Sequence, residues 1–348
     1  MKTAICSCPD TGPLESLVVL LGSAGYECLI LSGELAGYLH SLGCTHVKTA
    51  VHVQGKEGTE PHLPLRKARR DDLKTCDLFV DVKAHREAHK VWSVFPRLRE
   101  RTLWYRINGG KPEHLIRNGV DMGNEVNPPC PVLTPNQWYK GLFADARAYT
   151  CWPPFYRFDD YYQTHGREGS YYNSPICLIH NPVGWGFGNY VEKAKRVGVQ
   201  TYGIGSDLGI VKHHLVPRML SAALAMVHLK QNDAPGYALY EALAAACPLV
   251  VSERLVEMSR MHDLFEDGVT CLYFEKPGLE RIFGAGPSPE EVDEAIKGIE
   301  KCLQRLSDPA ENARIGLAGH NRLKELMWNE RKEEDGRGFQ EWMGRHFP

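Results

Sequence analysis

Short apolar segments alternate with segments of helical periodicity along most of this 348-residue chain. The predicted strands are residues 3–8, 26–31, 76–82, 102–107, 174–180, 199–204, 224–229 and 249–252. Helical spacing of apolar residues lies between them, as over residues 14–24, which Gly25 is placed to end, and again over residues 290–306. Strands that alternate with helices predict an α/β fold, because neighbouring parallel strands need a crossover connection between them. We expect parallel sheets with helices on both faces.

The alternating pattern is interrupted once, over residues 128–175. This stretch is rich in proline and aromatic side chains, which favours a passage between domains whose aromatic residues pack against both; stacking on a ligand is the less favoured alternative. A chain of this length is too long for one ordinary domain and suits two. We therefore expect a first α/β domain over residues 1–150, a linker over 151–173, and a second α/β domain over 174–325.

The composition limits the classes of function. Lys and Arg number 41 and Asp and Glu 43, a net charge of -2, so the chain as a whole is not a polycation. The apolar run near the N-terminus is far shorter than the ~20 residues that span a bilayer, and we expect no stable membrane insertion. Among the 11 cysteines, only Cys6 and Cys8 form a close pair, which favours buried reduced thiols over a metal site. We expect a cytoplasmic protein without a metal.

Three loops at the ends of predicted strands carry residue types suited to a ligand. They are residues 8–12, 108–111 and 181–189. Ligands of open α/β sheets bind outside the carboxyl ends of the strands, and glycine lets backbone N–H groups approach a phosphate. The third loop contains Gly184, Gly186 and Gly188, without the spacing of a dinucleotide fingerprint or the ending of a P-loop. A phosphate-binding loop and a structural glycine turn are both open from this signal alone.

The most specific signal is the stretch of residues 232–251, where an acid and a glycine precede an alanine-rich helix. Asp233 comes before the helix, Gly236 is at its start, and Glu241 follows in its second turn. A helix N-terminus near Gly236 suits a diphosphate, because free N–H groups and the helix dipole attract anions. Glu241 is suited to accept hydrogen bonds from ribose hydroxyls, and Asp233 can reach a neighbouring polyol. The stretch ends by passing through Pro248 into a strand.

This stretch resembles the donor-site motif of the GT-B glycosyltransferases, particularly the retaining family-4 type. Asp233 and Glu241 stand where that motif has two acids separated by seven residues, and Pro248 begins a matching Pro-Leu-Val-Val strand. The resemblance covers residues 174–330 well, and the first half of the chain only as a fold pattern. It implies two Rossmann-like domains facing each other across a cleft, and a C-terminal helix, over residues 326–348, that crosses back to the first domain.

The resemblance also implies a reaction. A sugar moves from a nucleoside diphosphate sugar, with a UDP-sugar favoured, to an acceptor hydroxyl, with retention of configuration and without a metal or other cofactor. The implied donor-binding residues are Gly184, Gly186, Gly188, Gly205, Val211, Lys212, Asp233, Gly236, Tyr237 and Glu241.

The chain departs from the family pattern in two places. Residues 180–182 lack the Arg that usually neutralises the diphosphate, and Lys193, Lys195 or Lys212 is a candidate substitute. Asp233 replaces the usual Glu, which leaves the identity of the sugar open. These departures keep an inactive relative among the alternatives.

The first half of the chain contributes residues at other strand ends. The resemblance places Arg106, Asn108 and Gly109 in a cleft loop that touches the donor sugar, with Asp10 and Thr11 at a neighbouring strand end. The catalytic candidates are Asp233, His85 and Asn108. A surface histidine without a role is the favoured alternative for His85.

Positive charge is concentrated in one segment of the first half. Residues 62–117 contain 14 Lys and Arg against 7 Asp and Glu, a local balance of +7. In the GT-B plan the first domain usually binds the acceptor, and a basic surface suits an anionic partner. Some phage enzymes of this plan glycosylate hydroxymethylated DNA bases. We predict an acceptor patch of Arg69, Arg70, Arg97 and Arg99, and a hydroxymethylated DNA base as the leading acceptor.

Several alternatives stay open. The charges of this segment also fit a solvated helical face. The acceptor also fits a glycan, a lipid or a small molecule. Two other classes of protein use the same plan: a nucleotide-sugar binder without turnover, and a GT-B epimerase, which the motif fits less well than a transferase.

Overall fold

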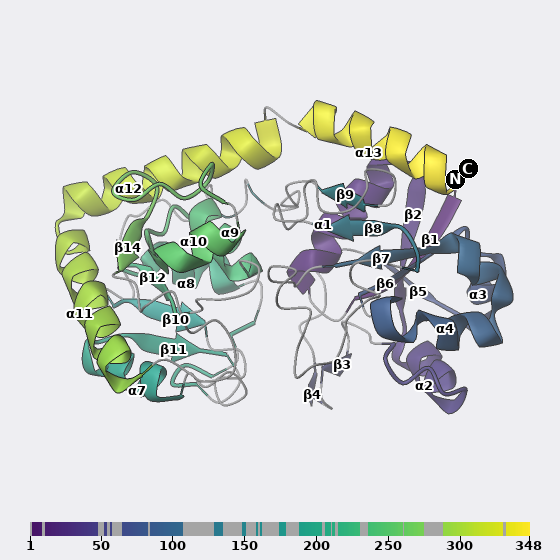
Figure 1. Ribbon diagram of the computed structural model, residues 1–348, viewed down its shortest axis with the longest axis horizontal. Helices are drawn as coiled ribbons and strands as arrows, with labels where there is room; N and C mark the ends of the chain where they lie inside the picture. The colour runs from purple at the N-terminus through teal and green to yellow at the C-terminus, as the bar shows by residue number, and fades with distance from the viewer. Residues whose placement is uncertain are drawn as a thin grey trace. The chain divides into compact units, whose positions relative to one another are not determined.

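The computed structural model describes residues 2–8, 11–47, 52–53, 56–57, 65–82, 84–106, 129–134, 148–150, 158, 161, 174–178, 188–203, 206–209, 211–212, 215–229, 236–259, 261–274, 288–329 and 332–348. The chain divides into two compact units (Figure 1). The first unit comprises residues 1–156 and 327–348, and the second comprises residues 157–326. Within the described ranges, no helix has the length and apolar character needed to cross a membrane.

The first unit is built on a seven-stranded sheet. Its strands, in order across the sheet, are β5 (Arg66–Ala68), β2 (Tyr26–Leu31), β1 (Lys2–Ser7), β6 (Leu78–Asp81), β7 (Thr102–Tyr105), β8 (Val132–Thr134) and β9 (Ala148–Thr150). Every neighbouring pair is parallel, which confirms the prediction from the alternating pattern. A small antiparallel pair, β3 (His52–Val53) and β4 (Lys56–Glu57), lies outside this sheet.

Helices cover both faces of the first sheet. They are α1 (Thr11–Ser23), α2 (Gly33–Ser41), α3 (Arg70–Thr75), α4 (Ala84–Val94), the 3-10 helix η1 (Pro96–Arg101) and α13 (Lys332–His346). Cys6 of β1 belongs to a core shared with Leu17 of α1 and Trp342 of α13, whereas the next residue back, Ile5, packs with Leu35 of α2. Successive residues of a strand point to opposite faces, so each face has its own buried core. Helix α13 also contacts α1, and the two helices are neighbours in Figure 1.

Local residues explain where the first helices begin and end. Gly25 adopts a φ of 81°, a conformation that glycine reaches without strain, and it follows the last turn of α1. Ser32 caps α2, because its Oγ accepts a hydrogen bond from the Leu35 N–H at 3.0 Å. The same hydroxyl donates to the Ala68 carbonyl at 3.1 Å, which ties the start of α2 to the end of β5.

The second unit is built on a five-stranded sheet whose pairings are again all parallel. Its strands, in order, are β11 (Gln200–Tyr202), β10 (Ile176–Leu178), β12 (Met226–His228), β13 (Leu249–Ser252) and β14 (Leu272–Phe274). Its helices are α7 (Gly188–Arg196), α8 (Val216–Ala222), α9 (Tyr237–Ala244), α10 (Glu253–Ser259), α11 (Pro289–Leu306) and α12 (Pro309–Leu323). A π-helical segment, Lys324–Asn329, continues α12.

The core of the second unit lies between the sheet and its helices. Cys177 and Val250 from the strands pack with Val191 of α7 and Ile299 of α11. Helix α9 contacts β12, β13, α8 and α12. The sequence prediction of a helix over residues 290–306 is confirmed by α11, which a capping box at Ser288 starts one residue earlier.

The cysteines pack as apolar side chains. The ten cysteines among the described residues are all buried and form no disulfide. Burial raises the pKa of the Cys76 thiol to about 11 and that of Cys177 to about 12, so both stay un-ionised near neutral pH. In the described part of the chain, no group of three His, Cys, Asp or Glu residues is arranged to hold a metal ion.

Candidate functional site

Buried polar side chains lie at the carboxyl ends of the strands in the second unit. Because its strands are parallel, these ends share one edge of the sheet. Tyr202, His228 and Ser252 are the last residues of β11, β12 and β13, and all three are buried. We name this set the second carboxyl edge. Polar groups avoid burial unless they are bonded, so their presence at strand ends makes this edge a candidate binding side.

The predicted donor motif places a helix start near this edge. Gly236 is the N-cap of α9, with an extended backbone (φ -70°, ψ 157°) and no side chain to cap the helix. The N–H of Leu239 bonds to the Gly236 carbonyl at 3.0 Å, whereas no side chain of the cap bonds to the first turn. Uncapped N–H groups and the helix dipole together favour an anion at this position.

Glu241 is a buried carboxylate in the second turn of α9. Only 8% of the residue is exposed, and every residue of the helix except Tyr237 is buried. Burial, followed by the negative charge of Glu241, raises the pKa of Tyr202 well above its ordinary value. The acid of the predicted motif therefore lies within electrostatic reach of the second carboxyl edge.

The candidate substitutes for the missing Arg differ in their surroundings. Lys193 and Lys195 lie in the last turn of α7, the end of the helix away from the strand ends. Lys193 Nζ is 2.5 Å from Asp293 Oδ1, and Lys195 Nζ is 2.9 Å from Asp207 Oδ1, so both cations are already paired. Lys212 is exposed and forms no ion pair with a described residue. Of the three, Lys212 is therefore the one that is not already paired with a described acidic side chain.

Of the remaining predicted donor-binding residues, the structure describes some and not others. Val211 is half-buried, Tyr237 opens α9, and Gly188 opens α7. Gly184, Gly186, Gly205 and Asp233 lie outside the described residues.

A second set of buried polar residues lies at the carboxyl ends of four neighbouring strands in the first unit. Ser7, Asp81 and Thr134 end β1, β6 and β8, and Arg106 directly follows β7. Each of these four residues is at most 5% exposed. We name this set the first carboxyl edge. Its position at parallel strand ends is again where open α/β sheets bind ligands.

A histidine completes the first carboxyl edge. His46 Nε2 lies 3.0 Å from Asp81 Oδ2, with side-chain exposures of 6% and 0%. His46 belongs to the connection after α2, 35 residues from its partner. Sequence reasoning missed both residues; the only signal was an Asp closing an otherwise apolar strand, Leu-Phe-Val-Asp.

Arg106 is the predicted cleft residue of the first half that the structure describes in full. Its side chain is buried and its guanidinium carbon lies 5.0 Å from the centre of the Trp104 ring. Its backbone N–H donates to the Leu133 carbonyl at 2.8 Å, which fixes it beside β8. The face of the Trp104 ring attracts the guanidinium and so helps to fix this buried cation at the carboxyl edge.

The other predictions for the first half receive less structural information. Thr11 begins α1 and His85 lies in the first turn of α4, and the side chains of both lie outside the described residues. Asp10, Asn108 and Gly109 lie outside them entirely.

The predicted acceptor patch is divided between opposite edges of the first sheet. Arg69 and Arg70 follow β5, at its carboxyl end, and Arg70 stacks on Tyr38 at 4.1 Å. Arg97 donates to the carbonyl of Cys76, two residues before β6 begins, and Arg99 lies in the same 3-10 helix. Arg97 and Arg99 are therefore at the amino edge. The structure brings together the arginines within each pair, but it places the two pairs at opposite edges.

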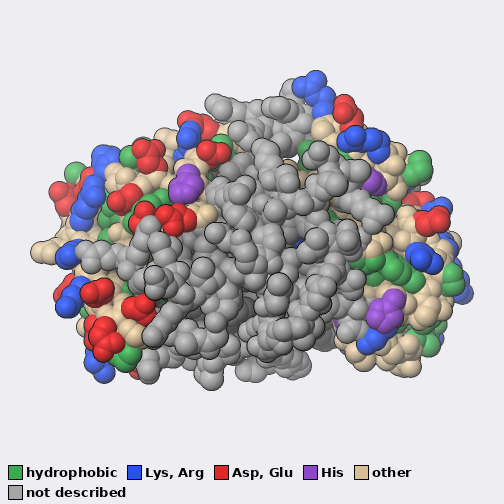
Figure 2. All heavy atoms as spheres, viewed as in Figure 1, with side chains coloured by type: hydrophobic (Ala, Val, Ile, Leu, Met, Phe, Trp, Pro, Cys, Tyr) green, Lys and Arg blue, Asp and Glu red, His purple; other side chains and the backbone are tan. Residues whose placement is uncertain are grey.

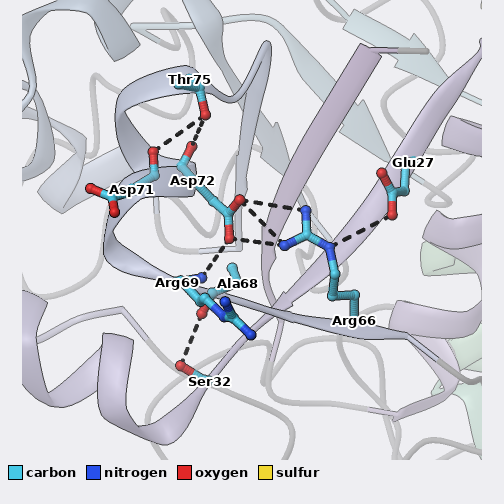
Figure 3. A network of polar contacts seen from close by, with 8 residues as sticks. All are labelled: Glu27, Ser32, Arg66, Ala68, Arg69, Asp71, Asp72 and Thr75. Atoms are coloured by element: carbon cyan, nitrogen blue, oxygen red, sulfur yellow. Dashed lines mark hydrogen bonds and ion pairs between the residues drawn. The ribbon is translucent and has the colours of Figure 1, made fainter.

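Acidic side chains compensate part of the local positive charge. Arg66 bonds to Asp72 at 3.2 Å and lies 3.8 Å from Glu27, and Asp72 also accepts from the Arg69 N–H (Figure 3). Lys74 pairs with Asp71 in the same way. Among the described residues that Figure 2 shows, acidic and basic side chains are interspersed. Sequence charge alone therefore overstates the positive field around β5 and α3.

Comparisons with known proteins identify the fold. No known family profile and no curated protein sequence matches the chain. Among solved structures, Anabaena Alr3699/HepE in complex with UDP-glucose aligns over 99% of this chain and 100% of its own, at 13% identity and a TM-score of 0.55. An alpha-glucosyltransferase in complex with UDP aligns over 98% of this chain and 100% of its own, at 11% identity and a TM-score of 0.57. The sucrose-phosphate synthase of Thermosynechococcus elongatus aligns over 99% of this chain and 100% of its own, at 11% identity and a TM-score of 0.55. The resemblance to GT-B glycosyltransferases is confirmed at the level of the fold.

Proposed function

We propose that the protein is a glycosyltransferase that moves a sugar from a nucleoside diphosphate sugar to an acceptor hydroxyl. In this proposal the two sheets face each other across a cleft, with the donor on the second carboxyl edge and the acceptor on the first. UDP is the favoured nucleotide, because structures of similar fold contain UDP or UDP-glucose. The described cysteines are buried in both units and form no disulfide, which fits the proposed reducing, cytoplasmic location.

One observation carries the proposal. The second acid of the two-acid motif, which is the most specific signal in the sequence, is Glu241, and it is buried in the second turn of a helix that begins at Gly236 without a side-chain cap. The N-terminus suits the diphosphate, and the carboxylate suits the ribose hydroxyls. The full-length match to a fold that glycosyltransferases share supports this assignment.

The chemistry requires stabilisation of the leaving group. The bond from the anomeric carbon to the phosphate oxygen breaks, the bond from that carbon to the acceptor oxygen forms, and the acceptor proton passes to the departing phosphate. The helix N-termini at Gly236 and Gly188, together with Lys212, supply positive potential where negative charge develops. Retention of configuration and independence from a metal are part of the proposal, as are roles for Asp233, His85 and Asn108.

Substitution of Glu241 tests the donor assignment. We expect Glu241→Ala to weaken UDP binding by at least about 10-fold, because each hydrogen bond lost with the carboxylate contributes about 1.5–3 kcal/mol. The measurement is isothermal titration with UDP, alongside release of UDP from UDP-glucose. Glu294→Ala, on the exposed side of α11, is the matched control. Equal UDP affinity in folded Glu241→Ala and wild type would refute the donor assignment.

We propose a hydroxymethylated base in DNA as the acceptor. One structure of similar fold, an alpha-glucosyltransferase with UDP and a 13-mer DNA containing a HMU base, aligns over 98% of this chain at 10% identity and a TM-score of 0.56. Arg69 and Arg70 lie at the carboxyl edge, where an acceptor would meet the first unit, whereas Arg97 and Arg99 lie at the other edge. The proposal therefore assigns DNA contact to Arg69 and Arg70.

The division of the arginines supplies a matched pair of variants. We expect Arg69→Ala with Arg70→Ala to weaken binding of a hydroxymethyl-containing duplex and to flatten its salt dependence by about 0.9 per lost phosphate contact. Arg97→Ala with Arg99→Ala removes the same charge at the amino edge and is expected to leave that slope unchanged. Equal slopes for the two double variants, or no salt-dependent binding by the wild type, would exclude this acceptor.

Two assays separate the other classes of function. Release of UDP from UDP-glucose distinguishes a transferase from a protein that only binds the nucleotide sugar. Recovery of an isomerised sugar without any acceptor would identify an epimerase. Efficient transfer to a small neutral alcohol would favour a glycan, lipid or small-molecule acceptor.

A further inference from the structure

His46 is held rigidly at the first carboxyl edge. It lies between Cys44 and Val47, which are both fully buried in the core under α2. The Cys44 N–H donates to the Leu39 carbonyl at 3.0 Å, and the ring of His40 bonds to the Val47 carbonyl at 2.7 Å. These anchors leave the His46 backbone little freedom. The ring is 6% exposed, and its Nε2 lies 3.0 Å from Asp81 at the end of β6.

Asp81 determines which nitrogen of the His46 ring carries the proton. A carboxylate only accepts hydrogen bonds, so His46 Nε2, at 3.0 Å from Asp81 Oδ2, must be the donor. In the neutral imidazole the other nitrogen, Nδ1, then has a free lone pair. Asp81 is fully buried at the last position of β6, which keeps water from competing for this hydrogen bond.

The pairing with Asp81 accounts for only one of the two ring nitrogens of His46. His46 Nδ1 is buried and forms no hydrogen bond within the described part of the chain. Buried polar atoms in native proteins are bonded in the large majority of cases, and the exceptions call for an explanation such as a ligand. The pair is also adjacent in register to Ser7, a second buried polar residue at this edge.

We propose that His46 Nδ1 accepts a hydrogen bond from the acceptor hydroxyl, and that Asp81 is a positioning residue that holds the ring in the required tautomer. This inference rests on the proposed function for the identity of the ligand. A lone pair recognises a hydrogen-bond donor, so phosphate and carboxylate groups are excluded as its partner. A metal ion would need further ligands, and the described residues contain no group of three that provides them. The hydrogen bond orients the hydroxyl and transfers no proton to the ring.

Two substitutions at position 46 separate this role from a structural one. In His46→Gln, the side-chain amide reaches the position of Nε2 and can still donate to Asp81, while nothing replaces Nδ1. In His46→Asn, the shorter amide replaces Nδ1 and loses the bond to Asp81. A purely structural histidine predicts that His46→Gln behaves as wild type. The proposal predicts that His46→Gln keeps the melting temperature but loses the response to a hydroxyl ligand.

The probes are 5-hydroxymethyl-2′-deoxyuridine and thymidine, which differ only in one hydroxyl, with methyl glucoside and glycerol representing other acceptors. Nitrogen-15 NMR of the wild type, without nucleotide, is expected to show His46 as the Nε2–H tautomer, with the Nδ1 resonance shifting on addition of a probe that carries the acceptor hydroxyl, which the deoxyribose hydroxyls shared with thymidine do not replace. Thymidine is expected to cause no shift. Affinity for the active probe should fall about tenfold or more in His46→Gln. Asp81→Asn, whose amide can donate to Nε2, should move the proton to Nδ1 and abolish the shift.

Three results would overturn the proposal. They are a wild-type ring that carries its proton on Nδ1, an Nδ1 resonance that no probe moves or that thymidine moves equally, and a folded His46→Gln with unchanged probe affinity. A shift produced by methyl glucoside or glycerol rather than the nucleoside supports the hydroxyl site and excludes the DNA acceptor. Failure to release UDP from UDP-glucose would refute the proposed function while leaving these nucleotide-free measurements readable.

Discussion

Gly319 lies where α12 presses against α9 and the turn before β14. A Cβ atom added at this position would be 2.6 Å from Leu243 Cδ2 and 2.8 Å from the Thr270 carbonyl oxygen. Leu243 is buried, so its side chain cannot swing into solvent. The turn is also fixed, because the Thr270 hydroxyl donates to the Leu264 carbonyl at 2.8 Å and accepts from the Glu266 N–H at 2.8 Å. Displacing either the Leu243 side chain or the Thr270 carbonyl therefore costs free energy.

These distances set the size of the effect of Gly319→Ala. Ordinary contacts between non-bonded carbon atoms are about 3.5–4.0 Å, so the new methyl group is roughly 1 Å too close to its neighbours. Overpacking of a core costs about 1–3 kcal/mol. Alanine is favoured over glycine in a helix by about 1 kcal/mol, which offsets part of that cost. Because the added methyl group meets two neighbours closer than 3.0 Å, we expect a cost in the upper part of that range. The expected net loss is about 1–2 kcal/mol, or a fall of about 2–8 °C in the melting temperature of a unit of this size.

Calorimetry and urea unfolding of Gly319→Ala measure this loss. The control is Gly37→Ala in the middle of α2, where an added Cβ meets no atom within 4 Å. The control should be as stable as the wild type or up to about 1 kcal/mol more stable, since only the helix propensity changes. If Gly319→Ala is as stable as the wild type while Gly37→Ala behaves as expected, the close packing of α12 on α9 is wrong.

Two further predictions concern helix ends and surface charge. Ser288→Ala removes the capping box of α11, in which Ser288 Oγ accepts from the Glu291 N–H at 3.2 Å, and should cost about 1 kcal/mol in urea unfolding; an unchanged midpoint would mean that the cap contributes nothing. Hydrogen bonds from Arg314 and Arg305 lower the pKa of Glu311 from its ordinary value of 4.5 to about 2. Because this pKa is lower in the folded than in the unfolded protein, the ionised Glu311 stabilises the fold fully above pH 4.5. That stabilisation is lost as the pH falls toward 2. The melting temperature of Glu311→Gln should therefore converge with that of the wild type over this range, and a constant difference would contradict the assignment.

The α/β class and the donor helix follow from the sequence, since both depend on neighbouring residues. A helix start at Gly236 and a carboxylate in the next two turns belong to one continuous segment, so their spacing specifies their relation before any tertiary contact forms. The alternation of strands and helices likewise predicts parallel pairing, because a helix between two strands gives a connection long enough for the crossover that parallel strands need. The strands β5, β8 and β9 escape this reasoning, because β5 is the polar segment Arg-Lys-Ala and the other two lie within the proline- and aromatic-rich stretch of residues 128–175.

The first carboxyl edge was decided by the tertiary structure. His46 and Asp81 are 35 residues apart, and they meet because the chain turns at Gly43 after α2 and packs Cys44 and Val47 into the core that contains Phe79 of β6. The four arginines of the predicted acceptor patch lie close together in the sequence, but the structure separates them into two pairs. Arg69 leaves β5 at the carboxyl edge and α3 carries the chain back to the amino edge, where Arg97 contacts Cys76. Each strand-and-helix unit reverses the direction of the chain, so the distance between two side chains depends on which edge each one reaches, and the order of strands in the sheet sets how far apart they lie along that edge.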